Sequence, residues 1–240
     1  MRASDFEKNE IKPWRQKMWC IPPEQNASFV AQMEQVLQVY ARPYAPSHPV
    51  VCMDEQPRQL LREMREPITT AHGGQRIDHE YIREGVCDVW MFTEPLGGWR
   101  DVRVTSRRTA IDWAQQVRAL VDDPRYADAE RITLVCDNLN THKFASLYEA
   151  FAPAEALRIA NRLELIHTPK HGSWLNVAEC ELSVMTRQCL SDRLADMGKI
   201  HRRVGPWSHQ RNARQIGVDW QFTADDARIK LKRLYPKVVE

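Results

Sequence analysis

The sequence lacks long hydrophobic runs, paired cysteines and repeats, and each absence excludes a class of protein. Its apolar stretches fall well short of the roughly 18–20 residues that a membrane-spanning helix needs, and the N-terminus has no apolar signal core. The six cysteines form no Cys-x-x-Cys pair, and the eight histidines do not supply the clustered ligands of a structural zinc site. No internal repeat or low-complexity tract is present. We therefore expect a cytoplasmic globular protein with reduced thiols.

The 240 residues carry a net charge of only +2, but the charge is unevenly distributed. Residues 183–240 hold 12 Lys and Arg against 6 Asp and Glu, which leaves −4 for the preceding residues. Such a basic segment is a candidate contact for a polyanion, although basic side chains on helices often form only a solvated face. With 43% apolar residues, the length allows one or two domains with a substantial core.

The pattern of apolar residues predicts helices and strands along most of the chain. Apolar residues at helical spacing predict a helix over about residues 25–41, and three prolines then predict an extended segment that leads into a strand at 50–54. Residues 55–80 are polar and interrupted by Gly73 and Gly74, so we expect a loop with at most a short helix. Further strands are expected at residues 86–93, 99–105, 132–137 and 163–167.

A turn and four helix starts complete the pattern. Residues 95–98 (Pro-Leu-Gly-Gly) predict a turn that pairs its flanking strands in antiparallel fashion. Helices are expected to begin near four residues, of which the first and last carry a capping-box pattern: Thr109, Lys143, Trp174 and Thr223. The order β-β-β-α-β-α-β-α indicates an α/β protein with a mixed sheet and helices on both faces.

Three carboxylates are the strongest candidates for chemistry. Asp54 and Asp137 each end a short hydrophobic run that is typical of a strand buried on both faces, and Glu179 lies on the helix expected from Trp174. A charge at such a strand end is costly to bury without a partner, and ligands collect outside the carboxyl ends of strands in open α/β sheets. A divalent cation is the simplest partner for the three carboxylates.

Two neighbouring carboxylates are weaker candidates. Successive side chains of a strand face opposite sides, so we favour Asp54 for the site and assign Glu55 as a solvated or outer carboxylate. Glu181 lies about 200° around its helix from Glu179 and cannot replace it. Two hard cations held by Asp54, Asp137 and Glu179 would activate a water or a 3′-hydroxyl for an in-line displacement. The residues alone therefore predict a metal-dependent nuclease or polynucleotidyl transferase.

Further polar residues surround this expected site. We expect them to orient DNA phosphates or the scissile group, and the two histidines among them are candidates for hydrogen-bonding the metal ligands. Turn and helix-cap chemistry is an equally good explanation for Asn138, Asn140 and Ser173. The full set is Asn138, Asn140, His142, Lys170, His171, Ser173 and Asn176, of which the last is expected to share a helix face with Glu179.

The residues around these carboxylates resemble the catalytic domain of the IS630-type transposases, which are relatives of the Tc1/mariner group. The resemblance covers nearly the whole chain from about residue 14 onward. It rests on residues 51–57 (Val-Cys-Met-Asp-Glu-Gln-Pro), 92–100 (Phe-Thr-Glu-Pro-Leu-Gly-Gly-Trp-Arg), 134–142 (Leu-Val-Cys-Asp-Asn-Leu-Asn-Thr-His), 168–179 (Thr-Pro-Lys-His-Gly-Ser-Trp-Leu-Asn-Val-Ala-Glu) and 222–228 (Phe-Thr-Ala-Asp-Asp-Ala-Arg).

The resemblance implies an RNase H-like fold with a five-stranded mixed sheet. It implies that Asp54, Asp137 and Glu179 bind two Mg²⁺ or Mn²⁺ ions, cleave DNA at transposon ends and join the 3′-hydroxyl to target DNA. A homodimer on DNA is expected, acting in the bacterial cytoplasm at the nucleoid. We expect residues 1–45 to form a linker and helix, residues 46–195 the catalytic domain, and residues 196–240 a basic helical extension.

One departure from the family concerns the N-terminus. Related transposases begin with helix-turn-helix modules that bind DNA, and this chain begins near the point where those modules would end. We expect the missing half to be a separate polypeptide or to have been lost. Two other functions stay open: a different RNase H-like nuclease, and a catalytically inactive remnant that binds DNA beside a full-length transposase.

Overall fold

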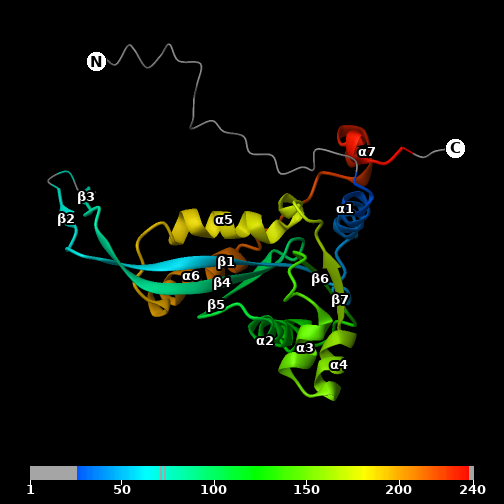
Figure 1. The fold of residues 1–240 in the computed structure, drawn as a ribbon, viewed down its shortest axis with the longest axis horizontal. Helices are drawn as coiled ribbons and strands as arrows, with labels where there is room; N and C mark the ends of the chain where they lie inside the picture. The colour runs from blue at the N-terminus through cyan, green and yellow to red at the C-terminus, as the bar shows by residue number, and fades with distance from the viewer. Residues whose placement is uncertain (1–25, 71, 73, 238–240) are drawn as a thin grey trace, which may run out of the picture.

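The central sheet is mixed and five-stranded, as the sequence predicts. The computed structural model describes residues 26–70, 72 and 74–237. The strands lie in the order β5-β4-β1-β6-β7 (Figure 1). They span Val50–Glu63 (β1), Tyr81–Glu94 (β4), Trp99–Thr105 (β5), Ile132–Cys136 (β6) and Leu163–His167 (β7). Strands β1, β4 and β5 pair antiparallel, whereas β6 runs parallel to both β1 and β7.

The prediction of a loop over residues 55–80 is wrong, because two strands extend into this region. Strand β1 continues to Glu63, and β4 begins at Tyr81 rather than at residue 86, so the two strands form a long arm (Figure 1). At its tip lie two short strands, Ile68–Thr69 (β2) and Gln75–Arg76 (β3). Pairing between β1 and β4 satisfies the backbone along the arm. Side chains of β1 beyond Glu55 are half-buried or exposed, with only Leu60 buried, so the arm lacks the run of buried apolar residues that marks a core strand.

Helices cover both faces of the sheet. On one face, buried residues of the sheet pack with the helices Ala27–Tyr40 (α1), Val177–Cys189 (α5), Met197–Ala213 (α6) and Ala224–Lys230 (α7). On the other face, the helices are Ala110–Val121 (α2), Phe144–Ala150 (α3) and Pro153–Asn161 (α4). Figure 1 shows α5 on one side of β1 and α2, α3 and α4 on the other. Within the described residues, no helix is long and apolar enough to cross a membrane.

Local sequence signals account for most helix boundaries. Both predicted capping boxes form, at Thr109 before α2 and at Thr223 before α7. The helix expected from about Lys143 to Phe151 or beyond ends at Ala150, because the chain is extended at Phe151, and a second helix then starts with Pro153 at its first position. The three-part division of the chain stays a prediction, although α1, α5 and α6 contribute to one buried cluster.

A buried group of charges joins α5 to β5 and α6. The carboxylate of Glu181 lies 3.1 Å from Arg100 Nε and 2.7 Å from an Arg211 side-chain nitrogen, and the side chains of Glu181 and Arg100 are 4% and 1% exposed. The side chain of Asn212 bonds both the backbone N–H and the carbonyl of Arg100. These contacts hold α5 against the sheet from the side opposite Glu179.

We expect Glu181→Ala to destabilise the protein by about 3–5 kcal/mol, because it leaves the Arg100 guanidinium buried without its counter-charge. Urea denaturation of the purified chain measures the loss. The control is Glu155→Ala, which breaks an exposed pair with Arg158 and should change stability little. Equal effects of the two substitutions would contradict the assignment.

Candidate active site

Strand β1 places Asp54 and Glu55 on opposite faces of the sheet. Val51 and Met53 pack with the cluster around α2, whereas Cys52 packs with the cluster around α5. By this alternation, Asp54 faces α5, which carries Glu179, and Glu55 faces α2. The Glu55 side chain is only 3% exposed, so the interpretation of Glu55 as a solvated carboxylate is wrong.

A pocket lies between β1 and α5. It has a volume of about 370 Å³ and is lined by Asp54, Glu55, Gln56, Glu179, Leu182, Ser183, Thr186 and Arg187. Both Asp54 and Glu179 therefore border one cavity, although they lie 125 residues apart in the sequence. Asp137 directly follows β6, which pairs with β1 in parallel through Cys52 and Val135. Asp54 and Asp137 therefore each lie two residues beyond these paired residues, although β1 does not end at Asp54, as the sequence predicted, but continues to Glu63.

The carboxylates at this edge raise one another's pKa values. Burial, followed by the charges of Glu179, Glu55 and Asp137, raises the pKa of Asp54 to about 8. Burial also raises the pKa of Glu179, with a further contribution from Asp137, while a hydrogen bond from the Ser173 side chain opposes the rise. Negative groups that repel one another in a partly buried site are the surroundings in which a divalent cation binds well.

A second contact network begins at Asp137. Its Oδ1 lies 2.5 Å from Nδ1 of His142, and Nε2 of the same ring lies 3.6 Å from Oε2 of Glu55. The carboxylates and the imidazole offer atoms that all lie within 4.8 Å of one another. Since Asp137 takes part in both networks, it connects the pocket at α5 with the buried groups on the α2 face.

Asn176 connects helix α5 to strand β1, a structural role that the sequence did not predict. Its side chain is buried, caps α5 by accepting a bond from Ala178 N at 3.1 Å, and donates from Nδ2 to the carbonyl oxygen of Met53 at 2.9 Å. This single side chain therefore joins the start of α5 to β1 immediately before Asp54, and so sets how Glu179 and Asp54 lie relative to each other.

All but one of the remaining predicted residues are exposed. His142 is buried, and Nζ of Lys143 lies 3.5 Å from the side chain of Asn140. His171 has a φ of 65°, a left-handed conformation at the turn that leads into α5. The exposed residues are Asn138, Asn140, Lys170, His171 and Ser173.

The residues present fit a divalent metal. The donors at the sheet edge are carboxylate oxygens, which are the ligands that Mg²⁺ and Mn²⁺ favour. Oε2 of Glu55 is buried without a hydrogen-bond partner among the described residues, so the negative charge at this edge is not balanced by hydrogen bonds alone. The charges of Glu179, Glu55 and Asp137 all raise the pKa of Asp54, and the charge of Asp137 also raises the pKa of Glu179.

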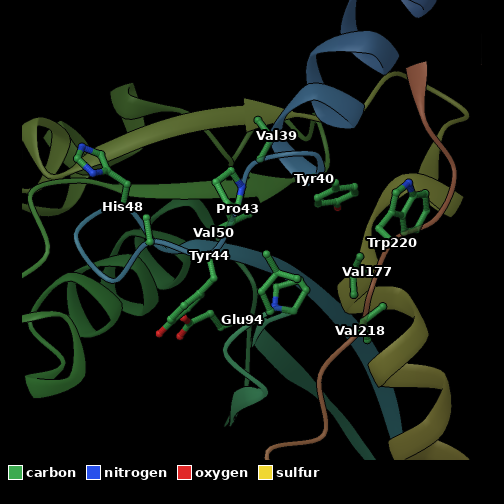
Figure 2. Close-up of a pocket in the computed structure, with 13 residues that line it drawn as sticks. Val39, Tyr40, Pro43, Tyr44, His48, Val50, Glu94, Val177, Val218 and Trp220 are labelled. Carbon is green, nitrogen blue, oxygen red and sulfur yellow. The ribbon is translucent and has the colours of Figure 1, made fainter. Parts of the chain in front are cut away.

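A second, more enclosed pocket lies away from these carboxylates. Figure 2 shows Tyr40, Tyr44, Pro43 and Trp220 around it, with Glu94 among the labelled side chains. It leaves only about 20 Å³ of free space. Glu94 is held by Arg125 at 2.9 Å and by the Tyr126 hydroxyl at 3.2 Å. The pocket is lined by the segment after α1, the β4–β5 turn and the C-terminal segment, so the packing of these segments against one another gives it a structural role.

Raising the pH should weaken the metal-free protein through Asp54. Its pKa is about 8 in the fold against an ordinary value of 3.8, so its contribution to stability is complete below pH 3.8 and is lost as the pH rises toward 8. We expect the free energy of unfolding, measured with urea in EDTA, to fall across this range and to fall less in Asp54→Asn. The control is Asp128→Asn, which removes an exposed carboxylate and should keep the parent's slope. An unchanged slope in Asp54→Asn would refute the assignment.

Comparison with known proteins gives one family and one fold. A family model described as "DDE superfamily endonuclease" matches residues 49–200. The catalytic domain of the Mos1 mariner transposase is similar in structure, with 14% identity and a TM-score of 0.56, over 90% of this chain and all of that one. The Mos1 mariner paired-end complex with Mn gives 16% identity and a TM-score of 0.54 over 88% of this chain. No curated protein gives a significant match.

At these identities the structural likeness establishes the fold, which is the RNase H-like α/β fold of a DDE transposase catalytic domain. This chain spans 64% of the Mos1 chain in the paired-end complex. The family match covers residues 49–200, which include β1, β6, α5 and the three carboxylates that these elements present. The chain therefore belongs to the DDE superfamily endonucleases.

Proposed function

We propose that the chain is the catalytic part of an IS630-type transposase, which cleaves DNA at transposon ends and transfers the strand into target DNA. The observation that carries the proposal is the meeting of three carboxylates, from β1, the end of β6 and α5, at one partly buried edge in a DDE endonuclease fold. Asp54, Asp137 and Glu179 are the catalytic residues and the metal ligands of this proposal.

We infer two Mg²⁺ or Mn²⁺ ions as the cofactor. Structures of the Mos1 transposase with Mn and with Mg support the choice of a divalent metal. When bound, two such ions supply an activated water or 3′-hydroxyl and stabilise the leaving oxygen of an in-line displacement. The chain's own part is to hold the ligands in place, so no nucleophilic side chain is required.

Two contacts and one raised pKa prepare the ligands for this role. Asn176 fixes α5 to β1 beside Asp54. The Ser173 side chain hydrogen-bonds the Glu179 carboxylate and favours its ionised form. Asp54, whose pKa is near 8, gives up its proton when a cation takes the proton's place. The fold holds these carboxylates close together although they repel one another, and binding of a cation would relieve this repulsion.

The DNA is proposed to lie across the exposed edge that surrounds the carboxylates. Asn138, Asn140, Lys170 and His171 are exposed there and are assigned to DNA contact, together with the Ser173 backbone and hydroxyl. The basic residues of the C-terminal extension add a second cationic surface. This proposal places the chain at the nucleoid of a bacterial cytoplasm. The three intact carboxylates argue against an inactive remnant.

We expect Asp137→Asn to abolish metal-dependent nicking and joining of labelled DNA that carries candidate transposon ends, because the amide removes a charged ligand shared by both networks. The assay compares Mg²⁺, Mn²⁺ and EDTA. Asp128→Asn makes the same chemical change at an exposed position and should keep full activity. If the parent is inert, the cognate helix-turn-helix segment is added in trans. Activity that persists in Asp137→Asn, or a parent that stays silent even then, would refute the proposal.

We also expect two copies of the chain to assemble on DNA, because cutting and joining two transposon ends requires that they be held together. The solved Mos1 complexes include paired-end assemblies, which supports this expectation. Mass photometry of the chain with a transposon-end duplex should show two chains per complex, and a scrambled duplex is the control. Complexes that contain a single chain at saturating protein would contradict a homodimer.

A further inference from the structure

We propose that Glu55 is a positioning residue that orients Asp137 through His142, so that Asp137 presents one carboxylate oxygen to the metal. The inference rests on the proposed function, because it takes Asp137 to be a metal ligand. Glu55 and His142 contact neither DNA nor metal in this proposal. They form a buried chain of contacts on the α2 face, behind the ligand that they orient.

The imidazole of His142 lies between two carboxylates. Nδ1 is 2.5 Å from Oδ1 of Asp137, and Nε2 is 3.6 Å from Oε2 of Glu55. The His142 side chain is only 1% exposed, whereas that of Asp137 is 35% exposed. Water therefore cannot replace the imidazole as the partner of Oδ1, and the outer side of the Asp137 carboxylate stays open toward the site.

The ring of His142 is fixed in this orientation by its surroundings. It stacks on Trp113 with a centroid distance of 5.6 Å and an interplanar angle of 25°. The carbonyl oxygen of His142 lies 2.7 Å from Nε2 of His167, the last residue of β7. Since both the backbone and the ring face are held, the edge of the imidazole has little freedom to turn away from Asp137.

The buried carboxylate of Glu55 has few partners besides His142. Oε2 of Glu55 is buried and has no hydrogen-bond partner among the described residues. The basic side chains within 4.0 Å of Glu55 in the described structure are His142, at 3.6 Å, and Arg108, at 3.9 Å. Arg108 is half exposed and is shared with Asp88 at 3.6 Å. A buried carboxylate with so few partners is retained at a cost in stability, which indicates a role beyond packing.

The geometry favours an ordered chain of contacts, in which His142 is hydrogen-bonded to Asp137 and lies at ion-pair distance from Glu55, over a cation held directly by these three side chains. Two atoms that bind one Mg²⁺ at about 2.1 Å in octahedral geometry lie about 3 Å apart. Nδ1 of His142 and Oδ1 of Asp137 are closer than this, at 2.5 Å, and therefore share a proton rather than an ion. Outer partners of this kind fix the direction of a ligand and typically change metal affinity by about 10–100-fold.

The test measures the affinity of the full chain for Mn²⁺ by electron paramagnetic resonance, with the number of bound ions as a second readout. Glu55→Gln should weaken binding by about 10–100-fold with the number of ions unchanged. The matched control is Asp88→Asn, which alters another buried carboxylate facing Arg108 but not His142, and should bind Mn²⁺ as the parent does. Urea unfolding in EDTA confirms that each variant is folded.

A double-variant cycle tests whether Glu55 acts through His142. If it does, Glu55→Gln combined with His142→Ala should bind Mn²⁺ no more weakly than His142→Ala alone. Parent-like affinity in Glu55→Gln, additive losses in the double variant, or loss of one bound ion, which would make Glu55 a direct ligand, would each overturn the inference. Asp137→Asn in the same assay separates the two proposals, because parent-like binding there would refute the metal site itself.

Discussion

Repulsion among buried carboxylates is the interaction around which this site is organised. Burial and the charges of Glu179, Glu55 and Asp137 raise the pKa of Asp54 to about 8, so the metal-free site holds a proton that an ordinary aspartate would have released. Groups that repel one another separate unless the structure around them is stiff. The elements that present the carboxylates therefore have to be fixed to one another. The contacts between these elements keep the carboxylates together.

Helix α5 is fixed on two sides, and each attachment has a different chemistry. At its N-terminus Asn176 bonds both α5 and the backbone of Met53, which sets the start of the helix against β1. Two residues after Glu179, Glu181 turns the other way into an ion cluster with Arg100 and Arg211. The third carboxylate, Asp137, is held from the α2 face by His142. Proposed metal ligands and structural charges thus alternate along short stretches of chain.

The sequence was informative wherever burial imposes a pattern. The positions of Asp54 and Asp137 could be predicted because a run of buried apolar residues stops at a charge, although β1 does not end at Asp54. The caps at Thr109 and Thr223 follow from local hydrogen bonding. The arm of β1 and β4 could not be predicted, because its exposed strands are stabilised by pairing partners distant in sequence. The burial of the Glu55 side chain could not be predicted from the sequence either, because its partner His142 lies 87 residues away. Family resemblance supplied the activity, which no pattern of apolar residues encodes.

The most direct test of the account is to locate Mn²⁺ by anomalous scattering in crystals of this chain. The account predicts two ions within about 2.0–2.3 Å of carboxylate oxygens of Asp54, Asp137 and Glu179, with His142 still bonded to Asp137. Ions seated between Glu55 and His142 instead, or no ions at these carboxylates at saturating Mn²⁺, would contradict the central claim that the three carboxylates form the metal site.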